Sequence, residues 1–176
     1  MKTSVVIKRV KAFIIDYFII LIYIGMLLGT SLLISKIFKF NLAGVNPVIG
    51  QLIAFVTLTF PVILYFTLSE NGKYGSTIGK RKLRLHIVSK TLTKASFGQL
   101  LLRNCIKFFP WELAHFFIFR LFYFTATNKT TPDWVLTGLI ASQLLAIIYL
   151  LFIIFNKNNR SIYEIFSQTR VVQKIT

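Results

Sequence analysis

Residues 12–34 read AFIIDYFIILIYIGMLLGTSLLI, an apolar run that carries a single charged residue, Asp16. A helix rises ~1.5 Å per residue, so a run of this length can cross the ~30 Å hydrocarbon core of a bilayer. Two further apolar runs, residues 48–68 and 134–155, carry no charge at all. The sequence therefore predicts three membrane-spanning helices.

The composition agrees with a membrane protein. Of the 176 residues, 55% are hydrophobic and only 15% are charged, whereas soluble domains usually carry about 25% charged residues. The high hydrophobicity excludes a disordered chain, and a single cysteine excludes a disulfide scaffold. No hydrolase elbow, catalytic triad spacing or CxxC motif is present, so we expect neither enzymatic activity nor a cofactor.

A fourth segment, residues 100–124, is apolar but interrupted by four charged residues and a histidine: Arg103, Lys107, Glu112, Arg120 and His115. It either crosses the bilayer or lies along the interface as an amphipathic helix. If it crosses, both termini and all but four of the 21 basic residues lie on one side; the exceptions are Lys36, Lys39, Arg120 and Lys129. The positive-inside rule makes that side the cytoplasm. We therefore expect a small all-α transmembrane bundle, residues 1–176 forming one multi-pass domain with cytoplasmic termini.

The longest polar stretch, residues 70–98, is the expected cytoplasmic loop. Within it, apolar and polar side chains alternate over residues 83–88, which is the periodicity of a strand. Residues 169–173 are also rich in strand-forming types. We expect these two segments to pair as a short β-ribbon beneath the membrane, with His86 as a solvated or lipid-facing side chain rather than a ligand.

The glycines of this loop do not form a phosphate-binding loop. The Gly79-Lys80 pair suggests one, but Tyr74 and Arg81 stand where the motif needs Gly and Ser or Thr. We interpret the glycines as turn residues that supply positive φ angles.

The formal net charge of +16 raises the question of nucleic-acid binding. No nucleic-acid-binding module is visible in the sequence. Basic residues beside membrane spans contact anionic lipid head groups, at ~1 kcal/mol each. The expected partner is therefore the anionic bilayer surface and not nucleic acid.

Three segments resemble the RDD family of bacterial membrane proteins, which is named for one Arg and two Asp. Residues 9–16 resemble the family's opening, in which an Arg at the start of the first span is followed seven residues later by an Asp; here these are Arg9 and Asp16. Residues 76–88 are similar to its loop, where a Thr-x-Gly-Lys turn leads into a strand. Residues 160–172, which begin with Arg160, are similar to its C-terminal motif, with Glu164 where the family usually has Asp. The resemblance implies a bacterial cytoplasmic (inner) membrane protein and, since cation/proton exchange has been proposed for the family, a role in transport.

The charged residues inside the spans require partners. Arg9 and Asp16 lie within ~20° of one helix face but ~10.5 Å apart along the axis, which is far for a direct pair. A carboxylate in the membrane is expensive unless it is paired or protonated. We expect Asp16 to pair with Arg103 or Lys107. Such a pair either fixes helix packing or forms part of a proton or cation site.

Glu112 and His115 are one helical turn apart and share a face. Binding a metal would need a second such pair, which the sequence lacks, so no metal site is expected. A proton relay of Asp16, Glu112 and His115 is the most specific transport hypothesis. Pro61 and Pro110 free the carbonyls of Thr57 and Ile106, which either kinks the helices or provides ligands for an ion.

Two classes of function remain open. One is a small transporter that moves protons or monovalent cations past its intramembrane carboxylates. The other is a non-catalytic scaffold or accessory protein whose basic loop binds anionic lipid or a protein partner. Gly25 and Gly29 form a Gly-x-x-x-Gly pattern that permits close helix packing, possible in a homo-oligomer.

Overall fold

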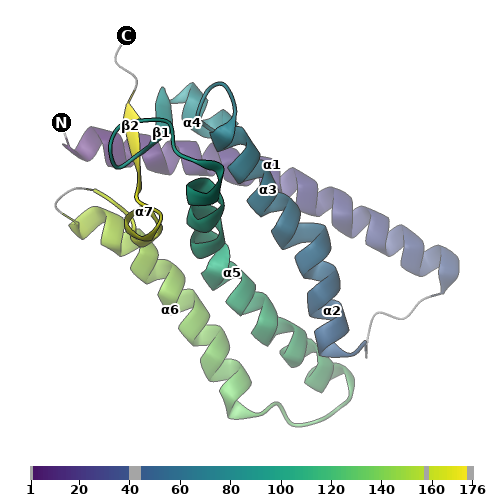
Figure 1. The fold of residues 1–176 in the computed structure, drawn as a ribbon. Coiled ribbons are helices and arrows are strands. Elements are labelled where there is room, and N and C mark those ends of the chain that lie inside the picture. Colours follow the sequence, from purple (N-terminus) through teal and green to yellow (C-terminus); the bar gives the residue numbers. More distant parts are fainter. Residues whose placement is uncertain (1, 40–44, 157–158, 174–176) are drawn as a thin grey trace. The chain divides into compact units, whose positions relative to one another are not determined.

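The computed structural model describes residues 2–39, 45–156 and 159–173 (Figure 1). Lys157 and Lys174, which belong to the basic side of the predicted topology, lie outside the described residues. The elements in chain order are α1 (Lys2–Phe38), α2 (Pro47–Ala54), the π-helix η1 (Phe55–Thr59), α3 (Phe60–Asn71), α4 (Ile78–Lys82), β1 (Leu85–Ser89), α5 (Phe97–Ala126), α6 (Asp133–Phe155), α7 (Ile162–Phe166) and β2 (Thr169–Gln173). The predicted class, a helical membrane protein with a short β-ribbon, is confirmed.

Three segments are long and apolar enough to cross a membrane: Val5–Phe38, Pro47–Asn71 and Asp133–Phe155. They contain the three predicted spans and extend beyond them. Their apolar side chains are largely exposed, as at Leu32 and Phe155, which suits helices that face lipid. The 30-residue α5 is ~45 Å long and could also cross, but its polar residues set it apart from the three apolar segments. Its crossing stays a prediction.

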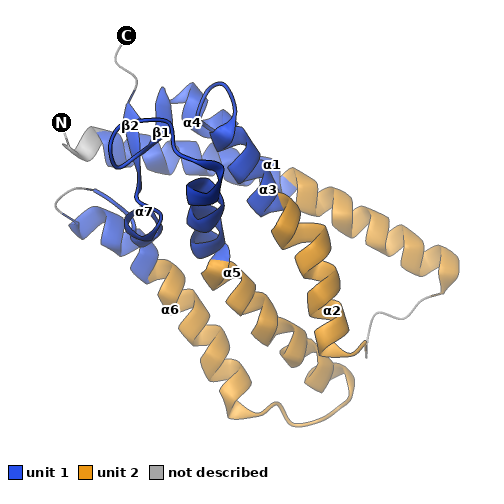
Figure 2. Cartoon of the chain, in the orientation of Figure 1, with its two compact units in different colours: residues 1–21, 62–108, 148–176 blue, residues 22–61, 109–147 orange. Residues whose placement is uncertain are grey.

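The chain forms two compact units (Figure 2). Unit 1 comprises Met1–Leu21, Val62–Phe108 and Ile148–Thr176. Unit 2 comprises Ile22–Pro61 and Phe109–Ile147. Helices α1, α3, α5 and α6 each contribute residues to both units.

The β-ribbon lies at the core of unit 1. Strands β1 and β2 pair antiparallel, with Leu85 opposite Gln173 and Ser89 opposite Thr169, which confirms the predicted pairing. The strand starts at Leu85 rather than at residue 83 because Arg84, at φ +57°, turns the chain out of α4. A two-stranded ribbon is marginal in water alone. Here it is supported by a cluster of apolar residues from the ribbon and the helices: Ala12, Leu85, Ile87, Ala95, Leu100 and Val171.

The same order of local structural elements precedes both strands of the ribbon. Thr77 caps α4 and Ser161 caps α7, and each hydroxyl accepts a hydrogen bond from the third backbone N–H of its five-residue helix. Arg84 and Gln168 then adopt positive φ angles, and a five-residue strand follows each. The cap, helix, turn and strand before and within β2 have the same lengths and spacing along the sequence as those before and within β1. Unit 1 therefore contains a repeated cap–helix–turn–strand module.

Gly79 in α4 allows a close approach to α1. A Cβ on Gly79 would lie 2.2 Å from the backbone oxygen of Ala12 and 3.0 Å from the Asp16 carboxylate. The expectation that the loop glycines supply positive φ therefore holds for Gly75, at φ +57°, but not for Gly79, which is helical. Position 79 requires glycine because a side chain would not fit there, and not because the backbone needs an unusual φ angle.

In unit 2, α5 contacts both α6 and α2. A Cβ on Gly138 of α6 would lie 2.1 Å from the Phe117 ring, and one on Gly50 of α2 would lie 3.0 Å from the Phe119 ring. These two glycines let the aromatic face of α5 sit against its neighbours.

Pro61 and Pro110 differ in their effect on the helices around them. The Thr57 carbonyl, which Pro61 frees, accepts a hydrogen bond of 2.6 Å from the Tyr23 hydroxyl. A π-helix, η1, directly precedes the turn that contains Pro61. This carbonyl is therefore satisfied within the protein and does not need an ion. Helix α5 continues through Pro110.

We expect Gly79→Ala to destabilise the protein by about 1–3 kcal/mol, the usual cost of forcing a methylene into a filled site. Thermal unfolding in detergent measures the effect. Gly98→Ala is the matched control, because a Cβ there meets nothing within 4 Å. Equal melting temperatures for the two variants would contradict the close contact between α4 and α1.

Candidate functional site

Asp16 accepts three hydrogen bonds inside unit 1. The Thr77 hydroxyl donates at 2.6 Å, the Gly79 backbone N–H at 2.9 Å and the Tyr65 hydroxyl at 3.4 Å. The side chain is closed off from solvent, with Asp16 only 1% exposed. The turn that resembles a phosphate loop in sequence thus binds an anion, and that anion is a carboxylate of the same chain.

Glu70, at the end of α3, lies in a second buried cluster. The Lys80 ammonium forms a salt bridge with its Oε1, and Arg103 Nε lies 3.6 Å from its Oε2. Asn104 Nδ2 donates to Oε2 at 3.1 Å and also to the Thr67 hydroxyl at 3.3 Å. Glu70 thus holds α4 and α5 against the end of α3.

Glu164 binds two arginines. Arg9 Nη1 lies 3.1 Å from Oε2 and Arg103 Nη2 lies 3.3 Å from Oε1, while the Ser161 backbone N–H completes a capping box at 3.0 Å. Glu164 is fully buried. Arg160 Nη2 donates to the Glu164 carbonyl at 2.9 Å, which further fixes α7. In this way α1 and α5 are tied to the C-terminal module.

Arg103 links the last two clusters. Its side chain is buried and pairs with Glu70 and Glu164, and Nη1 also donates to the Thr169 hydroxyl at 2.9 Å. The guanidinium lies 4.9 Å from the centre of the Tyr163 ring, a cation–π distance. Burial, with the Glu164 carboxylate as the next cause, raises the pKa of the Tyr163 hydroxyl above its usual value.

The predicted pairing of Asp16 with Arg103 or Lys107 is not observed. Among the described residues, no salt bridge within 4.0 Å involves Asp16. Arg103 is held by the two glutamates, and the Lys107 ammonium lies 3.5 Å from the Phe66 ring centre and 4.8 Å from that of Phe108. Donors from α4 satisfy Asp16 instead, because Gly79 lets that helix reach α1.

A separate polar cluster lies in unit 2 around Glu112. The Thr59 hydroxyl, at the end of η1, donates to Oε2 at 2.7 Å, and Gln51 Nε2 donates to Oε1 at 3.4 Å. His115 Nδ1 lies 3.6 Å from Oε2, as the shared helix face predicts. Arg120 Nη1 donates to Gln51 Oε1 at 3.2 Å. Unlike the three acids of unit 1, Glu112 keeps 23% of its side chain exposed.

The remaining predicted positions show no such clustering. A Cβ on Gly25 or Gly29 would meet nothing within 4 Å, so no described part of the chain packs against them. Over residues 2–39, 45–156 and 159–173, no group of three or more His, Cys, Asp or Glu side chains could hold a metal ion.

Arg9, Asp16 and Glu164 all belong to unit 1. The sequence model of the RDD family, a family of membrane proteins, matches residues 3–168. The chain belongs to the RDD family. No curated protein and no solved structure matches it.

In this RDD protein, the three residues that resemble the family's Arg and two Asp do not all contact one another. Arg9 binds Glu164, whereas Asp16 binds the turn that contains Thr77 and Gly79. All three residues instead join α1 to one or the other copy of the repeated module.

The sequence also left several partners unnamed. Sequence reasoning did not identify the buried pair of Glu70 and Lys80, although an acid at the end of an apolar span is itself a signal of such a pair. Asn104, Ser161 and Thr169 are common polar residues whose roles depend on contacts far apart in the sequence.

We expect Glu164→Gln to lower the free energy of unfolding by about 3–5 kcal/mol, because the buried Arg103 and the partly buried Arg9 lose their shared carboxylate. Asp133→Asn, at an exposed acid in the first turn of α6, is the charge-matched control. Unfolding of both variants in detergent measures the difference. Equal stability of the two would show that the Glu164 pairs contribute nothing net.

Proposed function

We propose that this RDD-family protein is a non-catalytic, multi-pass membrane protein whose basic cytoplasmic surface binds anionic lipid head groups and so serves as a membrane scaffold or accessory protein. The observation that carries the proposal is the contrast in unit 1 between its acids and its bases. Asp16, Glu70 and Glu164 are buried within internal hydrogen bonds and salt bridges. Many of the basic side chains around them are exposed.

The loop between α3 and α5 carries most of this exposed positive charge. From Asn71 to Trp111 the chain contains no acidic residue. The exposed basic residues of the loop are Lys73, Arg81, Lys82, Arg84, Lys90 and Lys94. Each basic residue near an anionic surface contributes ~1 kcal/mol of attraction. Such a surface favours phospholipid head groups over a neutral interface.

The ends of the chain support a four-span topology with the basic side in the cytoplasm of a bacterium. Arg9 Nη2 donates to the Val171 carbonyl and Arg9 Nη1 to the Asn159 carbonyl. Residues 9, 159 and 171 thus meet in unit 1, which supports an even number of crossings between them. Three apolar spans give an odd number, so the proposal makes α5 the fourth. The excess of basic residues then orients this side inward.

We expect reconstituted protein to select anionic lipid. Electron paramagnetic resonance with spin-labelled phosphatidylglycerol and phosphatidylcholine measures the selectivity at the protein surface. The preference for phosphatidylglycerol should fall as salt rises, because the screening length drops from ~10 Å at 0.1 M to ~3 Å at 1 M. Equal binding of the two lipids at low salt would overturn the proposal.

A second function, the movement of protons or monovalent cations, is favoured by the cluster around Glu112. This carboxylate is partly exposed, and its only salt-bridge partner among the described residues is His115. Its other contacts are a hydroxyl and an amide, from Thr59 and Gln51. A carboxylate with such partners can exchange a proton or bind a cation without breaking a permanent ion pair.

If this second function is correct, Glu112→Gln abolishes pH-dependent cation flux in proteoliposomes while it preserves the shape of the side chain. Asp133→Asn removes one exposed carboxylate and should leave the flux unchanged. The assay compares both variants with the wild type by means of a pH-sensitive dye inside the vesicles. Absence of flux in the wild type, or full flux in Glu112→Gln, excludes this role for Glu112.

A further inference from the structure

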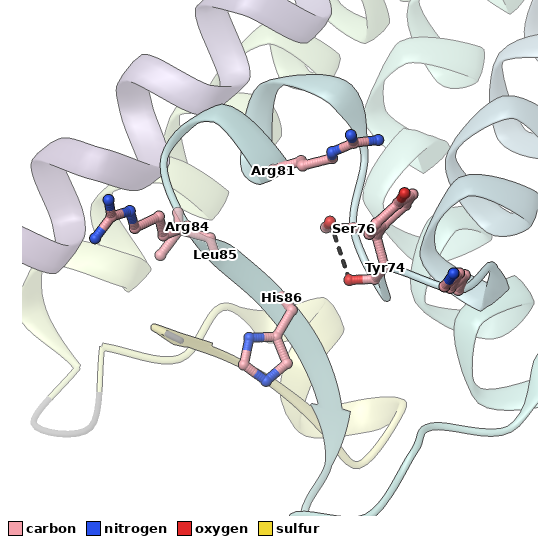
Figure 3. A pocket seen from close by; sticks show the side chains of 7 residues that line it. Tyr74, Ser76, Arg81, Arg84, Leu85 and His86 are labelled. Carbon is pink, nitrogen blue, oxygen red and sulfur yellow. Dashed lines mark hydrogen bonds between the residues drawn. The ribbon is translucent and has the colours of Figure 1, made fainter. Parts of the chain in front are cut away.

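Unit 1 contains a pocket of about 470 Å³ formed by the segment that follows α3. Its lining comes from the turn after α3, from α4 and from the start of β1 (Figure 3). The lining residues are Lys73, Tyr74, Ser76, Arg81, Arg84, Leu85 and His86. Three of these side chains are permanently cationic, a fourth is a histidine, and none is acidic.

Two of the cations are available to a ligand. Among the described residues, neither Lys73 nor Arg81 forms a salt bridge within 4.0 Å. The Arg81 guanidinium lies 3.9 Å from the centre of the Tyr74 ring, which orients it without using up its N–H donors. An arginine held in this way is suited to the paired hydrogen bonds that a phosphate group accepts.

The pocket also contains polar groups beyond these two cations. The Ser76 hydroxyl donates to the Tyr74 carbonyl at 3.1 Å, which shapes the turn that lines the pocket. His86 Nδ1 is buried and has no hydrogen-bond partner among the described residues. A buried nitrogen without a partner is costly, and a bound polar ligand would relieve that cost. A ligand bound here would thus give His86 a place at a binding site, in contrast to the solvated or lipid-facing role expected from the sequence.

The position of the pocket along the chain fits the head-group region. Lys73 follows the last residue of the candidate span Pro47–Asn71 by two residues. A chain extends at most ~3.6 Å per residue, so Lys73 lies within a few ångströms of that span's end. Tyr74 is 56% exposed and Ile78 is 49% exposed. An exposed tyrosine beside a span is typical of the membrane interface.

We propose that this pocket binds the phosphate group of an anionic lipid, with Lys73 and Arg81 as its main contacts. The inference rests on the proposed lipid-binding function and deepens it, because a general basic surface does not require a defined site. A phosphomonoester head group such as that of phosphatidic acid presents more negative charge and more free acceptor oxygens than a single phosphodiester head group does. The same chemistry would also recognise a soluble phosphate.

The test compares two double variants of the full-length protein in detergent. Lys73→Gln with Arg81→Gln removes the proposed contacts. Lys90→Gln with Lys94→Gln removes two exposed charges of the same loop that do not line the pocket. Both variants lose the same net charge, and thermal unfolding verifies that both are folded. Native mass spectrometry counts the bound phosphatidic acid and phosphatidylcholine, and inorganic phosphate and glycerol 3-phosphate are added as soluble competitors.

The proposal expects the wild type to bind phosphatidic acid in preference to phosphatidylcholine. The pocket variant should bind phosphatidic acid about thirtyfold more weakly, as expected for the loss of two charges at ~1 kcal/mol each that contact the phosphate directly. The Lys90 and Lys94 variant removes charges of the loop that do not contact the bound phosphate, so its affinity should fall clearly less. Displacement of the lipid by soluble phosphate would keep the site and assign it to a soluble ligand.

Two results overturn the inference and can be told apart. Equal weakening in both double variants would show that only the total charge matters, which rejects the pocket and leaves the proposed lipid-binding surface standing. No preference of the wild type for phosphatidic acid over phosphatidylcholine would reject the pocket and the proposed function together.

Discussion

The structure of unit 1 depends on the buried guanidinium of Arg103. This one side chain of α5 pairs with Glu70 at the end of α3 and with Glu164 in α7, and it also binds Thr169 of β2. Removing a cation and two carboxylates from water is costly, and only a full set of partners offsets the cost. The arrangement therefore favours one register of these elements over others. Helices whose surfaces are uniformly apolar have no comparable means of fixing their rotation about their own axes.

The repeated module explains how two short strands form a stable ribbon. Ile87 and Val171 face each other at the middle of the ribbon, and they occupy the same place in the two copies of the module. Pairing of equivalent residues is the arrangement that a two-fold axis produces between identical pieces. The third helical residues, Lys80 and Glu164, also correspond, yet they carry opposite charges and bind partners of opposite charge. The two copies therefore keep the same backbone path although the charge at this position is reversed.

Much of this fold could be predicted because its signals are local. The three spans follow from uninterrupted apolar runs, and the ribbon follows from alternation at residues 83–88 and β-prone residues at 169–173. The partner of Asp16 could not be predicted, because the choice between Arg103 and the donors of α4 depends on how closely α4 approaches α1. That approach is set by the absence of a side chain at Gly79. The repeated module was also not apparent, because capping positions and spacing recur in it rather than residue identities.

The candidate site was predicted in part for the same reason. Glu112 and His115 share a helix face, so their proximity follows from helical spacing alone. Their contacts with Thr59 and Gln51 come from another segment and depend on the π-helix that precedes Pro61. For the basic pocket, the sequence indicated only the excess of basic residues. Its shape could not be predicted, because its walls come from a turn, a short helix and a strand.

The contacts of Arg9 also constrain when the protein can finish folding. Its partners Asn159, Glu164 and Val171 are at least 150 residues away along the chain. During synthesis Arg9 therefore has none of these partners until the C-terminal module has left the ribosome. Nascent chains halted before that point present a solvated arginine at the membrane rim.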